Sequence, residues 1–266
     1  MEWYQQLTKW TDEGLRVILV TVIDRAGSAP RAPGAKMIVG ESGILSGTVG
    51  GGRFELEAIA EAQRLFSAAR PAAFLKKYAL GPAMGQCCGG TVEVLFEAVG
   101  FRPRLWIFGA GHIGAALTQV MQGSQFEVRL VDERTDWIER ISGAPVGTVK
   151  LNQSPLDVLA EVAPRWDTAW DFAVVTTHSH DLDLELIEKL LKVSRGSGYI
   201  GLIGSKSKWE RFRQRLAGRG ISENLLASVR CPIGSGPHGA DLMPHEIAIG
   251  IAAQLIAFLH SRNESQ

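Results

Sequence analysis

A glycine-rich turn in the middle of the chain constrains the fold more than any other feature. An apolar run at residues 105–108 leads directly into the sequence GAGHIG at residues 109–114, which has the pattern G-x-G-x-x-G. Apolar residues then recur at helical spacing, and a second apolar run at residues 128–131 ends in Asp132. Strand, glycine turn, helix, strand and acid in this order are typical of a dinucleotide-binding Rossmann unit. We therefore predict such a unit, with its first strand beginning near residue 104.

The three glycines of this pattern have different physical roles. Gly109 permits the tight turn, Gly111 lets the backbone approach a pyrophosphate, and Gly114 lets the helix pack on the strand. The helix that follows offers its unpaired N–H groups to phosphates. Asp132 is expected to favour a ribose 2′-hydroxyl over a 2′-phosphate, and the nearby Arg134 weakens that preference. The candidate cofactor-binding residues of this part are Gly109, Gly111, His112, Gly114 and Asp132.

Beyond Asp132, apolar runs alternate with segments of helical periodicity. The runs lie at residues 146–149, 172–176 and 199–203 and near Val229, and the helices are predicted from Ser154, across residues 186–191, at residues 206–218 and at residues 244–260. Strands that alternate with helices favour an α/β fold built on a doubly wound parallel sheet.

The first hundred residues show a different pattern. Predicted strands at residues 15–23, 36–39, 44–49, 72–78 and 91–97 outnumber the predicted helices at residues 1–13 and 53–69. Strands with few intervening helices suggest an α+β domain. Gly100 and Pro103 interrupt the pattern between the two parts. We therefore predict a smaller α+β domain over residues 1–99 and a Rossmann-like domain over residues 100–266.

A loop predicted at residues 24–34 is rich in small residues and carries positive charge. Gly27 and Ser28 would let the backbone come close to a ligand, and Arg25, Arg31 and the following Lys36 could neutralise an anion. The alternative is a surface loop whose charges are solvated.

Two further stretches of the first part could contact a ligand. Gly50, Gly51 and Gly52 precede a predicted helix and could form an anion nest, or merely a flexible connector. Cys87 and Cys88 lie in a glycine-rich loop between two predicted strands, where thiols can be exposed and reactive. The alternative for these cysteines is that they are small apolar residues of a core.

Composition narrows the classes of function. Lys and Arg balance Asp and Glu to a net charge of zero, so nothing indicates a nucleic-acid or membrane partner. Residues 1–20 lack the pattern of a signal peptide, and no apolar run reaches membrane-spanning length. The chain has 3 cysteines, two of them adjacent, which disfavours a disulfide framework and indicates a reducing cytoplasm.

Several patterns taken in order closely resemble the XdhC family, of which CoxI is a relative. They are R-x-G-S-x-P-R-x-x-G-x-K, G-x-V-G-G-G-x-x-E, C-G-G, GAGHIG, THSHD at residues 177–181 and GLIGSK at residues 201–206. Family members are accessory proteins for xanthine dehydrogenase and related molybdenum hydroxylases. The resemblance implies a chaperone that binds molybdenum cofactor (molybdopterin), protects it while its terminal sulfur is installed, and delivers it to the apo-enzyme. By position, Cys88 and the glycine loops around Gly27 and residues 50–52 are candidate cofactor contacts, and Cys87 is an additional thiol.

The same resemblance implies partners. Xanthine dehydrogenase or a related molybdoenzyme is the expected partner, a cysteine desulfurase is a further candidate, and a homodimer is the expected assembly. A cofactor-insertion chaperone, rather than a turnover enzyme, is therefore the main interpretation. An NAD(P)-dependent oxidoreductase and a sulfur-transfer enzyme that uses Cys87 or Cys88 are the alternatives. The Rossmann part could hold NAD(P), another nucleotide, part of the pterin cofactor, or no ligand.

Two regions of the C-terminal half carry further expectations. His178 and His180 follow the end of a predicted strand, where we expect them to form hydrogen bonds and not to bind a metal. Residues 231–234 match the XdhC pattern, whereas residues 235–241 depart from it.

Overall fold

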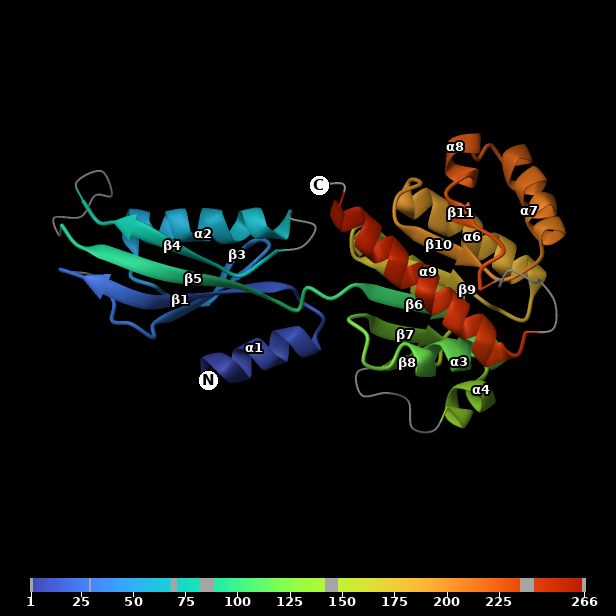
Figure 1. Ribbon diagram of the computed structural model, residues 1–266, viewed down its shortest axis with the longest axis horizontal. Coiled ribbons are helices and arrows are strands. Elements are labelled where there is room, and N and C mark those ends of the chain that lie inside the picture. The colour runs from blue at the N-terminus through green and yellow to red at the C-terminus, as the bar shows by residue number, and fades with distance from the viewer. Residues whose placement is uncertain are drawn as a thin grey trace. The chain divides into compact units, whose positions relative to one another are not determined.

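The computed structural model describes residues 2–28, 30–67, 71–81, 89–141, 148–234 and 242–264. The chain divides into two compact units, Met1–Phe101 and Arg102–Gln266 (Figure 1). Of the helices within the described ranges, none combines the length and the apolar character needed to cross a membrane.

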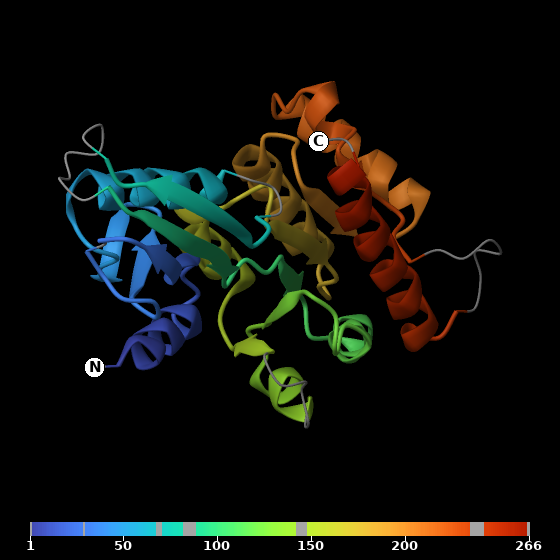
Figure 2. The ribbon, with the colours of Figure 1, turned by 60° about the vertical axis from the view of Figure 1, so that its left-hand side comes forward.

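The first unit is an antiparallel sheet with a helix on each face. The sheet has the strand order β3-β2-β1-β5-β4. Its strands are β1 (Val17–Ala26), β2 (Lys36–Gly40), β3 (Gly43–Gly47), β4 (Phe74–Ala79) and β5 (Thr91–Val99). Figures 1 and 2 show α2 (Gly52–Phe66) along one face and α1 (Trp3–Asp12) against the other. This arrangement confirms the α+β architecture expected for the N-terminal part.

The alternation of side chains along β1 explains the two layers. Ile18, Val20 and Val22 point to the α2 side and join its main core, whereas Val17 and Leu19 belong to a smaller cluster against α1. The predicted loop from residue 24 is wrong in its first three residues, because β1 continues to Ala26. A register shift between Val22 and Asp24 lets β1 keep pairing with β5, so tertiary pairing overrides the loop-like local composition.

The second unit is a parallel six-stranded sheet with the order β11-β10-β9-β6-β7-β8. Its strands are β6 (Arg104–Phe108), β7 (Glu127–Val131), β8 (Val149–Leu151), β9 (Asp171–Val175), β10 (Tyr199–Leu202) and β11 (Val229–Arg230). The helices are α3 (His112–Val120), α4 (Thr135–Arg140), α5 (Pro155–Val162), the 3-10 turn η2 (Ala163–Arg165), α6 (His180–Ser194), α7 (Lys206–Gly218), α8 (Glu223–Leu226) and α9 (Pro244–Glu264).

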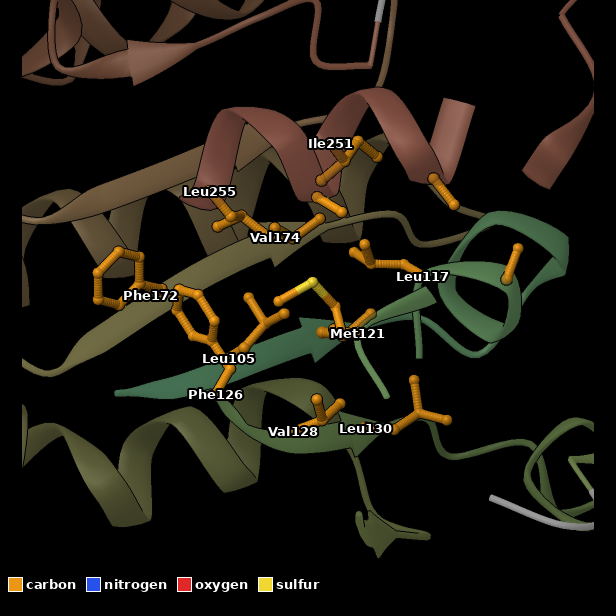
Figure 3. Close-up of a cluster of buried hydrophobic side chains, with 14 of the residues drawn as sticks. Leu105, Leu117, Met121, Phe126, Val128, Leu130, Phe172, Val174, Ile251 and Leu255 are labelled. Atoms are coloured by element: carbon orange, nitrogen blue, oxygen red, sulfur yellow. The ribbon is translucent and has the colours of Figure 1, made fainter. Parts of the chain in front are cut away.

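Hydrophobic cores lie on both faces of this sheet. Leu105 and Ile107 of β6 pack with α3 and α9 in the cluster drawn in Figure 3. Trp106 and Phe108 point to the opposite face and pack with α5, α6 and α7. A strand buried on both faces reads as a continuous apolar run, which explains why the sequence predicts β6. The predicted doubly wound parallel sheet is confirmed.

The sheet changes its winding direction between β6 and β9. From β6 the chain moves outward through β7 to β8, then returns to β9 on the other side of β6 and continues to β11. Ligands of open α/β sheets bind at the carboxyl ends of the strands beside such a switch point. The segments that leave β6 and β9 there are the glycine turn at residues 109–111 and residues 176–179.

Candidate functional site

Two of the predicted ligand loops of the first unit touch through their glycine backbones. A Cβ atom built on Gly90 would lie 2.3 Å from the carbonyl oxygen of Ser28 and 2.7 Å from that of Ala26. A Cβ atom on Gly27, whose φ is +76°, would lie 3.1 Å from the Cα of Gly90. Only glycine permits such an approach, so the loop after β1 and the C-G-G segment before β5 are packed backbone to backbone.

The third loop reaches the same region. Gly50 has a φ of +142°, and a Cβ atom there would lie 2.4 Å from the ring of Pro30 and 3.7 Å from Arg31 Cγ. Arg31 is exposed, and it forms no ion pair within the part of the chain that the structure describes. The structure therefore brings together all three glycine loops that the sequence singled out. Cys87 and Cys88 themselves lie outside the described residues.

The anion nest predicted at residues 50–52 already holds a carboxylate of the chain. Glu55 Oε2 accepts hydrogen bonds from the N–H groups of Val49 at 3.0 Å, Gly50 at 3.3 Å and Gly51 at 3.1 Å, and from the hydroxyl of Thr48. Burial opposes the charge on Glu55, but the hydrogen bonds from Thr48 and the backbone outweigh it and lower its pKa. The sequence-based prediction missed this role, although Glu55 is the final residue of the pattern G-x-V-G-G-G-x-x-E.

The cationic residues of the first loop lie in different places. Lys36 Nζ donates a hydrogen bond to Thr21 Oγ1 at 3.0 Å and lies 4.7 Å from the ring centre of Trp3. Trp3 belongs to α1, so Lys36 lies on the sheet face opposite α2 and its glycine loop. Arg25 lies in β1, opposite Val92 of β5, and is exposed.

In the second unit, the three glycines of the turn differ in how strongly the fold requires them. A Cβ atom on Gly109 would lie 2.5 Å from the carbonyl oxygen of Thr176, and one on Gly114 would lie 1.9 Å from that of Gly109. A Cβ atom on Gly111 meets nothing within 4 Å, and the φ of Gly111 is −63°. Packing thus accounts for Gly109 and Gly114, while the space at Gly111 is open for a ligand to approach.

Asp132 is buried beside this turn and is fully hydrogen-bonded. Its Oδ2 accepts from the N–H of Ala110 at 2.7 Å and from Arg134 Nη2 at 2.7 Å. Its Oδ1 accepts from the backbone N–H and the Nε of Arg134, both at 2.9 Å. Asp132 therefore fixes the glycine turn to the segment that follows β7.

Aromatic and cationic side chains gather beside Asp132 and the glycine turn. The imidazole of His112, the first residue of α3, lies edge-on to the indole of Trp137 with ring centres 5.1 Å apart. The guanidinium groups of Arg134 and Arg140 lie 5.0 Å and 5.4 Å from the same ring centre. We call His112, Arg134, Trp137 and Arg140 the Trp137 cluster.

The segment after β9 completes the switch point. Thr176 Oγ1 donates a hydrogen bond to Gly109 O at 3.1 Å, so this segment touches the glycine turn directly. His178 and His180 are both exposed, and His180 begins α6. In the described ranges of the chain, no group of three or more His, Cys, Asp or Glu residues could hold a metal ion.

The sequence-based predictions also missed a buried ion pair near this edge. Lys208 Nζ donates hydrogen bonds to Asp183 Oδ2 at 2.6 Å and to Ile203 O at 3.0 Å. Asp183 Oδ1 in turn accepts from the hydroxyl of Thr177 at 2.7 Å. The sequence does contain a signal that these two charged residues are buried. Asp183 lies four residues before Ile187, and Lys208 lies four residues before Phe212, so each charged residue shares the buried face of its helix with an apolar one.

Cys231 lies close to this ion pair. Its Sγ is 3.9 Å from Gly204 O and 4.0 Å from Ser205 O. Burial, only partly offset by the charge of Lys208, raises the pKa of its thiol to about 11. Residues 235–241, where the sequence departs from the expected pattern, lie outside the described residues.

Comparisons with known proteins find relatives that are similar in sequence to this chain. A relative from Escherichia coli K12, the uncharacterized protein YqeB, is 28% identical over 96% of this chain and 46% of its own length. A protein of Bacillus subtilis 168 named as a probable subunit of xanthine dehydrogenase is 28% identical over 62% of this chain and 46% of its own length. The molybdenum cofactor insertion chaperone PaoD of Escherichia coli K12 is 24% identical over 95% of this chain and 86% of its own length. The chain thus spans about half the length of the first two relatives.

Family models match both units of the chain. Residues 10–79 match the model of the XdhC and CoxI family, and residues 105–255 match that of the XdhC Rossmann domain. The second match alone covers more than half of the chain and includes the glycine turn, Asp132 and the Asp183–Lys208 pair. The chain therefore belongs to the XdhC and CoxI family.

Proposed function

We propose that this chain is an accessory protein that binds molybdenum cofactor and delivers it, in sulfurated form, to xanthine dehydrogenase or a related molybdenum hydroxylase. The names of two relatives, a molybdenum cofactor insertion chaperone and a probable component of xanthine dehydrogenase, support this role. The observation that carries the proposal is the packing of Gly90 on Ser28 and of Gly50 on Pro30, which joins three glycine loops in one region.

The residues of this region fit the chemistry of the cofactor. Molybdenum cofactor is a pterin with a dithiolene-bound metal and a terminal phosphate. Gly27 and Gly90 are required by the contact between the loops, whereas Gly51, where an added Cβ atom meets nothing within 4 Å, leaves room for a planar ligand to approach the backbone. Exposed Arg31 is suited to neutralise the phosphate, whereas the N–H groups of residues 49–51 are engaged by Glu55. The thiols of Cys87 and Cys88, which precede Gly89 in the chain, are soft ligands suited to molybdenum and sulfur chemistry.

The proposed role is that of a chaperone and not of a turnover enzyme. A cysteine desulfurase would supply the terminal sulfur, and direct contact with the acceptor enzyme would prevent loss of a labile cofactor to water. We propose a cytoplasmic homodimer as the working form. The expectation of a cytoplasmic location rests on the cysteine pattern of the sequence, in which two of the 3 cysteines are adjacent.

We further propose that the Rossmann unit binds a nucleotide at the glycine turn. The support is that neither close packing nor a positive φ requires a glycine at position 111. The space beside Gly111 is open, so a ligand can approach its backbone. A nucleotide phosphate would lie at the N-terminus of α3, where unpaired N–H groups favour negative charge.

Cofactor retention tests the first proposal directly. Wild-type protein, Cys88→Ala and Cys231→Ala are purified without oxygen, and their molybdenum and pterin contents are measured. We expect Cys88→Ala to lose most of the bound cofactor, while Cys231→Ala serves as a matched control and retains it. Equal retention in all three proteins would remove Cys88 from the mechanism.

A deletion strain tests delivery. In the absence of this protein, the acceptor enzyme should be folded, with its iron–sulfur and flavin centres in place, but should lack active molybdenum cofactor. Normal activity and molybdenum content in that strain would contradict the chaperone role. Nicotinamide-dependent turnover of a substrate by the purified protein would instead support an oxidoreductase.

A further inference from the structure

Asp132 occupies the position from which a Rossmann unit usually binds the ribose. An acid at the end of the second strand normally accepts hydrogen bonds from the 2′-hydroxyl of NAD. Asp132 is only 4% exposed, and each of its oxygens accepts two hydrogen bonds from Ala110 or Arg134. A carboxylate offers about four lone-pair sites, so none remains for a ribose hydroxyl.

Arg134 forms a bidentate ion pair with Asp132, so both oxygens of the carboxylate are hydrogen-bonded to the same guanidinium. Its Nε and Nη2 donate to different oxygens, at 2.9 Å and 2.7 Å. Burial raises the pKa of Asp132, but the hydrogen bonds from Arg134 and Ala110 outweigh it, so the pKa lies below its ordinary value. The carboxylate therefore stays ionised at neutral pH, and the ion pair persists.

The groups that this end of β7 offers to a ligand are donors. A guanidinium carries about five N–H groups, and Asp132 takes two from the Arg134 side chain. Arg140, the last residue of α4, and His112, the first residue of α3, lie against the same indole of Trp137. Hydrogen-bond donors and positive charge favour a ligand group that accepts hydrogen bonds and is anionic.

The neighbouring acids do not reverse this balance. Glu133, Asp136 and Glu139 belong to the same segment, and all three are exposed. Water and salt screen the charges of exposed side chains strongly. The side chain of Arg134 is 27% exposed and is held in place by a buried acid, so part of this fixed cation is accessible to a ligand.

We propose that the Rossmann unit selects a nucleotide whose ribose carries a phosphate group, and that Arg134 and Arg140 determine this choice. The inference rests on the nucleotide binding proposed above and names its ligand class. A 2′-phosphorylated dinucleotide meets the donors of the Trp137 cluster, whereas an unmodified ribose finds no acceptor on Asp132.

Calorimetric titrations of the full chain with NADP+, NAD+ and inorganic phosphate test this selection. We expect NADP+ to bind at least about tenfold more tightly than NAD+, a ratio that corresponds to about 1.4 kcal/mol. Arg140→Ala should weaken NADP+ binding several-fold and leave NAD+ binding unchanged. Arg213→Ala, which removes an exposed arginine of α7 outside the cluster, is the matched control and should preserve the ratio.

A paired variant tests Arg134 without leaving a buried charge unpaired. Asp132→Asn/Arg134→Gln should lose the preference for NADP+, and its thermal melting curve verifies that it is folded. NAD+ binding as tight as NADP+ binding, or an unchanged ratio in the paired variant, would overturn the proposal. Inorganic phosphate that binds as tightly as NADP+ would overturn it as well, by reducing the site to a general anion site.

The outcomes separate this inference from the proposals on which it rests. Failure of the wild type to bind any nucleotide would overturn both this inference and nucleotide binding at the turn. The molybdenum content of the same samples would still report on cofactor binding by the first unit.

Discussion

Lys208 donates a hydrogen bond to Asp183 at 2.6 Å, and the side chains of both residues are buried. The pair connects α6 to α7, and through Thr177 and Ile203 it also connects the segments that leave β9 and β10. It therefore holds together the carboxyl edge of the sheet on one side of the switch point. A charge buried this deeply depends on its partner, which makes the pair sensitive to single substitutions.

Lys208→Met should lower the free energy of unfolding by about 3–5 kcal/mol, because it leaves Asp183 buried without a counter-charge. Lys192→Met is the matched control, since Lys192 pairs with Glu188 on the surface of α6. That change should cost less than about 1 kcal/mol. Urea denaturation measures both, and equal losses would show that burial of the Asp183–Lys208 pair has no energetic consequence.

The lowered pKa of Glu55 predicts a pH-dependent stability. A carboxyl group whose pKa falls on folding stabilises the protein at pH values above its pKa in the unfolded chain, which is about 4.3 for glutamate. This stabilisation is lost as the pH falls through the pKa of the group in the folded protein. The wild type should therefore melt at a higher temperature than Glu55→Gln at neutral pH, with a difference that shrinks below about pH 4.3. Glu57→Gln, at an exposed ion pair on the same helix, is the control. A constant difference across pH would contradict the role assigned to Glu55.

The glycines of the Rossmann turn should respond differently to the same substitution. Gly114→Ala places a Cβ atom 1.9 Å from Gly109 O. We therefore expect the free energy of unfolding to fall by at least about 1–3 kcal/mol, the loss that is typical of an overpacked core. Gly111→Ala meets open space and should leave the melting temperature nearly unchanged. If Gly111→Ala nevertheless weakens nucleotide binding, Gly111 serves the ligand and not the fold. Comparable destabilisation by both substitutions would refute this division of roles.

Gly89 and Gly90 form a second matched pair. Gly90→Ala would force the backbone away from Ser28 O, whereas a Cβ atom on Gly89 meets nothing within 4 Å. We expect Gly90→Ala to reduce molybdenum retention several-fold and Gly89→Ala to preserve it. Metal analysis of the two purified variants decides this, and retention by both would mean that the contact between these loops does not shape the cofactor site.

The raised pKa of Cys231 predicts slow alkylation. In a Cys87→Ser/Cys88→Ser background, Cys231 is the remaining thiol of the 3 cysteines. With a pKa of about 11, its thiolate fraction at pH 8 is lower than that of an ordinary thiol with a pKa of about 8.5 by roughly two orders of magnitude. The rate of reaction with iodoacetamide should keep rising to about pH 11. A rate that levels off near pH 8.5 would place the thiol in an ordinary environment.

Elements with strong local patterns could be predicted from the sequence. The run of β6, the helical spacing of α3 and the run of β7 each reflect neighbours along the chain, so their predicted positions agree with the structure within one or two residues. Ser154 followed by Pro155 marks the start of α5, because proline at the first helical position suits the helix geometry. The predicted end of β1 is wrong, because its last residues are strand only through pairing with β5.

Local patterns along the chain were enough to predict the order of the two architectures, the family and the loops that carry small and charged residues. The partners of those groups depend instead on contacts between distant segments of the folded chain. Glu55 fills the nest that the sequence predicts as a site for an external anion, and Arg134 occupies the acid that the sequence predicts as a ribose ligand. Asp183 and Lys208, on different helices, form a pair that no local pattern links. Propensity and periodicity depend on near neighbours in the chain, whereas the partners of a buried polar group are set by which distant segments the fold brings together.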